Sequence, residues 1–151
     1  MADSNIATIT NSNFDTDRYG NKLKCVNFGF SVPSNAQITG VLMTINQNSY
    51  AGTGITYSAQ LTDTSGNAAG TGATTLDNSA IVPSAYYKYN HGGLTDLWGC
   101  ALTPAWVNDA DFGVIFQHKS TGVNYDIYVS YVRGAVFYTL TGQQMLKKGM
   151  W

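Results

Sequence analysis

The chain has 151 residues, of which 44% are hydrophobic and only 11% charged, and its formal net charge is -1 at pH 7. This length suits a single domain, which typically buries roughly 70% of the surface that its unfolded chain would expose. The eight basic residues are spread along the sequence, so nucleic acid and anionic membranes are both disfavoured as partners. All nine acidic residues are Asp, which favours turns over helices and leaves no glutamate for acid catalysis.

The N-terminus and the cysteines bear on the compartment. Residues 1–8 contain no basic segment followed by an apolar core, and no later run approaches the roughly 20 apolar residues that span a bilayer. We therefore expect a soluble product made in the cytoplasm. Cys25 and Cys100 lie far apart without CxxC spacing, which favours buried free thiols over a disulfide.

Alternation of apolar and polar residues indicates strands in the first half of the chain. It predicts strands over residues 23–32, 38–46 and 54–62, joined as a meander or a Greek key. The first ends at Pro33-Ser34-Asn35, and the third ends at the turn-forming residues 63–67. The Gly-, Ala- and Thr-rich segment 67–78 then indicates a surface loop.

One short helix is expected in the second half. Thr103 suits the N-cap and Pro104 the first helical position, so a helix of one or two turns is predicted near 103–109, ending at Asn108-Asp109. Before it, Tyr86, Tyr87 and Tyr89 indicate either a short strand or an exposed aromatic platform.

The last strands complete the fold prediction. Residues 112–118 and 123–129 alternate on either side of Ser120-Thr121-Gly122, which is typical of a hairpin. Residues 131–140 form another strand-like run, in which Gly134 indicates a bulge or a close backbone approach. At least seven strands with one short helix predict an all-β fold, a single β-sandwich or jelly roll. We divide the chain into an N-terminal arm and first turn (1–22), the β-sandwich domain (23–141) and a C-terminal tail (142–151).

Three segments carry a resemblance to known proteins. Two of them begin Cys25-Val-Asn-Phe-Gly-Phe-Ser-Val-Pro and Asp96-Leu-Trp-Gly-Cys-Ala-Leu-Thr-Pro-Ala-Trp, and the third is Tyr131-Val-Arg-Gly-Ala-Val-Phe-Tyr. Together they resemble a recurring β-sandwich module of tailed-phage virion proteins, and the resemblance spans most of residues 23–139. In it, Pro33 and Gly40 bracket a turn between two core strands.

The resemblance implies a phage virion structural protein. The expected role is a capsid decoration or cement protein on the head surface, since no long repetitive or coiled-coil segment points to a fibre. Its partners are then the major capsid protein and further copies of itself, most simply a homotrimer, and its location is the surface of the phage particle. The alternatives are a tail-associated receptor-binding module that recognises host-surface carbohydrate, and a free carbohydrate-binding domain.

Catalytic and metal-binding motifs are nearly absent from the sequence. His91 and His118 have no Cys or His at metal-ligand spacing, and no nucleophile elbow, P-loop or dinucleotide fingerprint is present. Two Asp pairs, 15 with 17 and 109 with 111, offer oxygen ligands for calcium, but capping of turns explains them more simply. We expect no enzyme activity, no cofactor and no metal.

Partner-binding residues are expected mainly at the two ends of the chain. The N-terminal anchors are Ile6, Ile9 and Phe14, and the C-terminal anchors are Met145, Leu146, Lys147, Lys148, Met150 and Trp151. The tail has a second interpretation, in which it folds back over its own sheet. A glycan platform of Tyr86, Tyr87 and Tyr89 stays open as an alternative, whereas Trp98 and Trp106 are expected in the core because they lie inside apolar segments.

Overall fold

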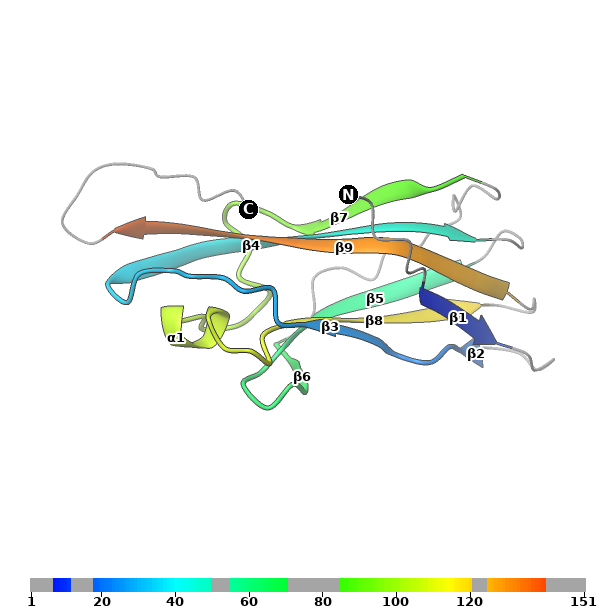
Figure 1. Cartoon of the computed structure of the whole chain (residues 1–151), viewed down its shortest axis with the longest axis horizontal. Helices are drawn as coiled ribbons and strands as arrows, with labels where there is room; N and C mark the ends of the chain where they lie inside the picture. The colour runs from blue at the N-terminus through cyan, green and yellow to red at the C-terminus, as the bar shows by residue number, and fades with distance from the viewer. Residues whose placement is uncertain (1–6, 12–17, 50–54, 71–84, 121–124, 141–151) are drawn as a thin grey trace.

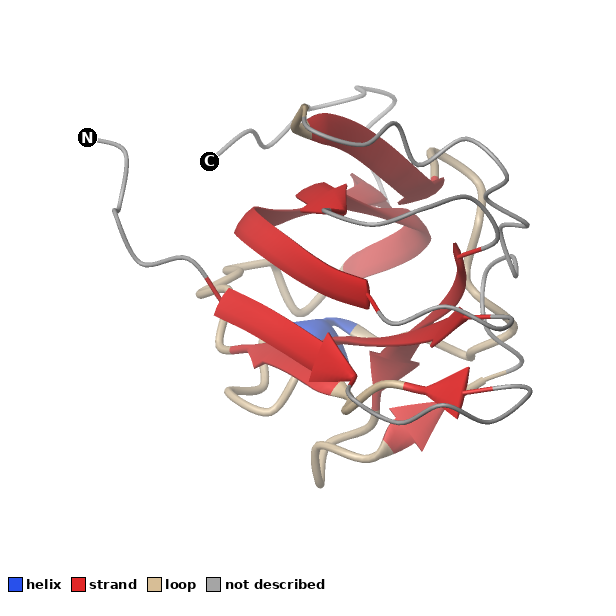
Figure 2. Ribbon diagram, turned by 90° about the vertical axis from the view of Figure 1, so that its right-hand side faces the viewer, coloured by secondary structure: helices blue, strands red, loops and turns tan. Residues whose placement is uncertain are grey.

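The computed structural model describes residues 7–11, 18–49, 55–70, 85–120 and 125–140 (Figure 1). Nine strands and one helix lie within these ranges, and Figure 2 shows how strongly the strands dominate. In chain order they are β1 (Ala7–Asn11), β2 (Arg18–Tyr19), β3 (Leu23–Val26), β4 (Ala36–Ser49), β5 (Ile55–Thr62), β6 (Ala68–Ala69), β7 (Tyr87–Gly92), α1 (Pro104–Val107), β8 (Gly113–Ser120) and β9 (Tyr125–Leu140).

The strands form two antiparallel sheets. Sheet A has the order β1-β9-β4-β7, and sheet B has the order β2-β8-β5-β6, with β3 also paired to β8. In Figure 1 strands β4, β7 and β9 of sheet A lie above β3, β5 and β8 of sheet B, so the two layers enclose one core between them. The predicted all-β sandwich with one short helix is confirmed.

The strand order is that of a jelly roll. Because β2 and β3 both pair with β8, at its last two and its first four residues respectively, they act as one interrupted strand. Counted this way, the described strands number eight, and the two sheets have the orders 1-8-3-6 and 2-7-4-5. In this order every pair of successive strands crosses between the sheets except β5 and β6, which pair with each other in sheet B.

This order agrees with the Greek-key alternative, because a jelly roll consists of two Greek keys, whereas the meander and the expected hairpin are wrong. A meander would pair β4 with β5, and the expected hairpin would pair β8 with β9, but in each case the two strands belong to opposite sheets. The residues between β8 and β9, 121–124, lie outside the described part of the chain. Each of these strands buries one face, and alternation alone does not say whether two such strands lie side by side or face each other across the core.

The first predicted strand is also shorter than expected. It ends at Val26 instead of Val32, because Asn27 (φ 62°) and Gly29 (φ 69°) adopt left-handed backbone conformations that an extended strand does not contain. The apolar residues beyond the break still reach the core: Phe28 stacks on Phe30 with 5.7 Å between ring centroids. The alternation thus predicted correctly which side chains point inward, but it predicted a strand beyond Val26 where the backbone is not extended.

Strand β4 is longer than predicted and is interrupted by irregularities between Ile38 and Gly40 and between Asn46 and Gln47. Gly40, expected beside a turn, lies inside this strand, where the backbone of Gly93 and Leu94 leaves no room for a side chain. Gly134 pairs regularly with Met43, and a Cβ there would come within 2.8 Å of the Phe30 ring. It therefore marks a close approach and not a bulge.

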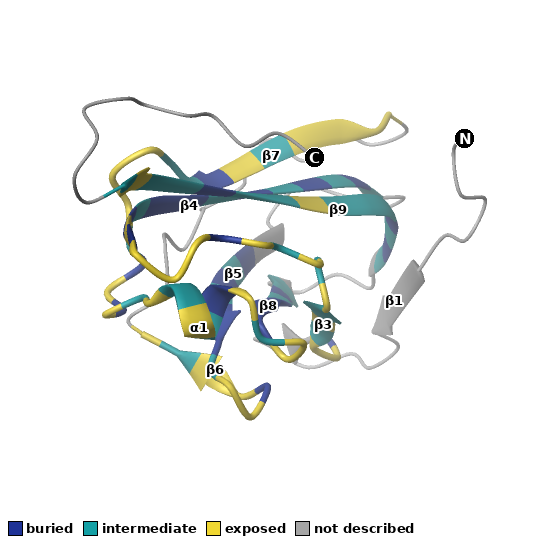
Figure 3. Ribbon diagram, turned by 60° about the vertical axis from the view of Figure 1, so that its left-hand side comes forward, coloured by how far each residue is buried: buried dark blue, intermediate teal, exposed yellow. Residues whose placement is uncertain are grey.

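Trp98 is the largest fully buried side chain of the core, at 1% exposure. It lies in the segment that leads from sheet A to α1, and its indole Nε1 donates to the carbonyl oxygen of Val41 in β4 (2.9 Å). Its backbone has a positive φ of 59° and is held by a hydrogen bond from its N–H to the Asp96 carboxylate (2.8 Å). In Figure 3 the buried stretch of β4 lies opposite the buried stretches of the neighbouring strands β5 and β8. The prediction that Trp98 packs in the core is confirmed.

Helix α1 is capped as expected and also secures a long loop. The Thr103 side chain accepts from the N–H of Trp106 (3.2 Å), and Asn108 is the C-cap. The Asn108 amide donates to the Val32 carbonyl and accepts from the Val32 N–H, both at 2.8 Å. One side chain thereby joins the helix to the connection between β3 and β4.

The ends of the described chain belong to the sheets. Strand β1 pairs with β9 and β2 pairs with β8, so both strands fall inside the segment that the sequence separates as an N-terminal arm. Both cysteines are free, as expected; Cys100 is buried, whereas Cys25 is only half-buried. Within the described ranges, no helix has the length and hydrophobicity needed to cross a membrane.

Candidate binding surfaces and a buried polar cluster

Most of the expected terminal anchors lie outside the described residues. This holds for Ile6 and Phe14 at one end and for all of Met145, Leu146, Lys147, Lys148, Met150 and Trp151 at the other. Ile9 is in β1, where its backbone is paired opposite Ile127 of β9. The anchor role of these residues stays a prediction.

The three tyrosines of the expected platform have different environments. Tyr86, directly before β7, and Tyr87, its first residue, are 44% and 45% exposed. Tyr89 is half-buried, and its ring meets that of Tyr57 edge-on with 6.0 Å between centroids. The exposed aromatic surface here thus consists of two adjacent tyrosines where the edge strand of sheet A begins.

A polar cluster that the sequence did not reveal lies inside the sandwich. It consists of Tyr57 and His118 from sheet B and Gln47 and His91 from sheet A, all at most 1% exposed. The Tyr57 hydroxyl is 2.7 Å from His91 Nε2, and His118 Nε2 is 2.8 Å from Gln47 Oε1. Each hydrogen bond therefore joins one sheet to the other. The Tyr57 ring also stacks on His118 and meets His91 edge-on, with centroids 5.1 Å apart in both cases.

Burial keeps these two histidines neutral. Removal from water lowers the pKa of His91 and of His118 to about 4, and burial, with Tyr89 contributing, raises the pKa of Tyr57. The Nδ1 atoms of both imidazoles are buried without a hydrogen-bond partner. The cluster is closed to solvent, so it joins the sheets and is not placed to meet a substrate.

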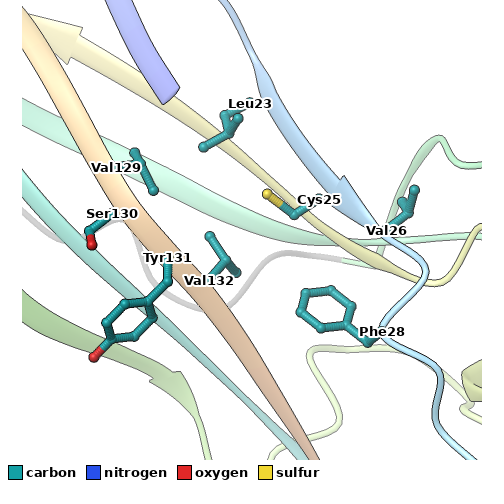
Figure 4. A pocket seen from close by; sticks show the side chains of 8 residues that line it. All are labelled: Leu23, Cys25, Val26, Phe28, Val129, Ser130, Tyr131 and Val132. Atoms are coloured by element: carbon teal, nitrogen blue, oxygen red, sulfur yellow. The ribbon is translucent and has the colours of Figure 1, made fainter. Parts of the chain in front are cut away.

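An open groove of about 270 Å³ lies between the two sheets on one side of the sandwich. Figure 4 shows its lining, which comes from β3 and one residue beyond it on one side and from β9 on the other: Leu23, Cys25, Val26, Phe28, Val129, Ser130, Tyr131 and Val132. Burial raises the pKa of the Cys25 thiol, so this cysteine is a weak nucleophile and part of an apolar wall. Sequence analysis placed Cys25 and Val132 in strands but did not bring them together, since they are brought together only by the stacking of the two sheets.

Beside this groove, β9 presents a partly uncovered edge. Strand β1 pairs with its first five residues, 125–129, and β4 pairs along its other side from residue 127 to the end. Among the described strands, none covers residues 130–140 on the side where β1 lies. Unpaired strand edges are templates for another extended chain. We call the groove and this uncovered edge together the β9 docking face.

The acidic pairs weighed for calcium are not arranged as a metal site where the structure describes them. Asp109 accepts a hydrogen bond from the N–H of Asp111 (2.8 Å), the turn-capping role that the sequence favours. Asp15 and Asp17 lie outside the described residues. In the described part of the chain, no three His, Cys, Asp or Glu side chains are grouped closely enough to hold a metal ion.

Comparison with known proteins gives no relative for this geometry. No family model, no curated protein and no solved structure matches the chain.

Proposed function

We propose that the chain is a non-enzymatic structural protein of a tailed-phage virion, a decoration or cement protein that binds the capsid surface. The sequence resemblance over residues 23–139 supports the phage assignment. The observation that carries the binding role is the β9 docking face, where an apolar groove adjoins a strand edge that no described strand covers. A capsid segment that adds a strand there would gain main-chain hydrogen bonds from the edge and side-chain contacts from the groove.

Particle binding tests this role. We expect the purified protein to co-sediment with virions that lack it, and electron microscopy of the loaded particles to show added density on the head. Density on the tail would favour the receptor-binding alternative, and no association with the particle would overturn the proposal.

The docking face is tested with a lysine at position 130. Ser130 lines the groove from β9 and is half-buried, so Ser130→Lys places a long charged side chain at the β9 margin of the groove, and we expect it to weaken particle binding by at least tenfold. Thr95→Lys, at an exposed position outside the groove, adds the same charge as a control and should bind normally. Equal binding of both variants would exclude the docking face; a chain that ends at Gly142 then tests whether the C-terminal residues hold the particle instead.

The proposal includes self-association, most simply as a homotrimer, because closed symmetry protects strand edges from open-ended pairing. We expect sedimentation equilibrium at tens of micromolar to give three times the chain mass of 16.3 kDa. A monomer at this concentration would leave assembly to the capsid alone.

A second candidate function is recognition of host-surface carbohydrate by a tail-associated module. The observation that favours it is the exposure of Tyr86 and Tyr87, which lie next to each other at the start of β7. Tyrosine combines an apolar ring with a hydroxyl and is frequent at binding interfaces.

A further inference from the structure

A second groove, of about 360 Å³, lies at the end of the sandwich where β5 turns into β6. Asp63 and Thr64 line it from that turn, and Thr103, Ala105, Trp106 and Asp109 line it from α1 and its flanking residues. It shares no residue with the β9 docking face or with the exposed tyrosines.

Both carboxylates of this groove are held in place by backbone hydrogen bonds. Asp63 accepts from the N–H groups of Ser65 and Asn67, both at 2.8 Å, and these bonds lower the pKa of its carboxyl. Lys24 Nζ, from β3, donates to the Gly66 carbonyl of the same turn (3.1 Å). Asp109 accepts from the N–H of Asp111. The groove therefore presents two carboxyl groups whose positions are set by backbone hydrogen bonds before any ligand arrives.

Trp106 supplies the aromatic wall. Its indole Nε1 donates to the Thr62 carbonyl (2.9 Å), and the ring packs partly against the core. The side chain is half-buried, and the remainder of its surface lines the groove. The sequence predicted Trp106 as a core residue; in the structure it is shared between the core and this groove.

From this arrangement we infer that the groove is a saccharide-binding subsite. A sugar ring offers an apolar C–H face to an aromatic side chain and hydroxyl donors to fixed carboxylates, and hydrogen bonds to charged acceptors are the stronger kind. Sites that recognise an ammonium ligand typically surround it with several aromatic side chains. Here one aromatic residue stands beside four oxygen-bearing side chains, those of Asp63, Thr64, Thr103 and Asp109. That balance suits a polyhydroxylated ligand. The inference goes beyond capsid binding and rests on neither proposed function.

Ala105 offers a direct test because it is exposed, lies on α1 and lines the groove. The probe is an immobilised array of neutral mono- to tetrasaccharides of hexoses and N-acetylhexosamines, followed by calorimetric titration of the strongest. We expect Ala105→Arg to fill the groove and weaken binding at least tenfold. Ala101→Arg, exposed and outside the groove, is the matched control and should stay within twofold of the original chain.

Three results would overturn the inference. The first is that no saccharide of the array binds. This result would leave the capsid proposal unaffected, because that proposal is tested separately by binding to the phage particle. The second is that Ala105→Arg binds as well as the original chain while Tyr86→Ala/Tyr87→Ala does not, which would move recognition to the tyrosines. The third is that binding disappears with a calcium chelator, because direct recognition by the carboxylates needs no metal.

Discussion

Acidification from pH 6.5 to pH 5 is expected to lower the free energy of unfolding by about 3 kcal/mol, through the two buried histidines alone. Both have a pKa of about 4 in the folded chain, against about 6.5 for an exposed histidine. The unfolded chain therefore binds more protons than the folded one in this interval, and stability present above pH 6.5 is lost as the pH falls toward 4. Urea unfolding at closely spaced pH values measures the slope.

Few other side chains titrate between pH 6.5 and pH 5 in this chain. The chain has no Glu, and an ordinary Asp, with a reference pKa of about 3.9, titrates below it. His91 and His118 are the only histidines, so His118→Gln should reduce the slope by about half while leaving one titrating group. A stability that stays flat between pH 6.5 and pH 5 would contradict the closed cluster, because it would mean that the imidazoles gain protons equally well in the folded chain.

Trp98→Ala is expected to produce the largest loss of stability from a single substitution, about 3 to 5 kcal/mol. The change empties the most voluminous fully buried position and removes the hydrogen-bond donor of the Val41 carbonyl. Since a domain is typically stable by only about 5 to 15 kcal/mol, this variant is expected to be close to unfolding. Chemical denaturation followed by circular dichroism provides the measurement.

Two further variants keep this prediction decisive. Trp98→Phe retains an aromatic ring but no donor for Val41, and it should lose about 2 kcal/mol or more, from the cavity and the unpaired carbonyl together. Leu94→Ala, at a position that is 63% exposed in the same connection, should change stability by less than about 0.5 kcal/mol. Equal effects of Trp98→Ala and Leu94→Ala would show that Trp98 does not hold this segment to β4.

The capping of α1 illustrates what a short stretch of sequence is able to predict. Thr103, Pro104 and Asn108 each act on backbone groups only a few residues away, so their residue types were enough to predict the helix and both of its ends. The second role of Asn108, its paired hydrogen bonds to Val32, joins residues 76 positions apart. A pattern of neighbouring residues in the sequence does not predict a contact over this separation.

The sequence by itself determined the β class, the single short helix and most of the buried side chains, because these depend on alternation and on nearby backbone chemistry. In the predicted strand 38–46 the alternation places the apolar residues Val41, Met43 and Ile45 on one face, and all three are fully buried. Only the tertiary structure decided which strands pair, because a strand with one apolar face satisfies its pattern equally well beside a neighbour or across the core from it. The same limit hid both grooves and the histidine cluster. His91 and His118 are 27 positions apart in the chain, and they approach the same tyrosine only because β7 and β8 lie in opposite layers of the jelly roll.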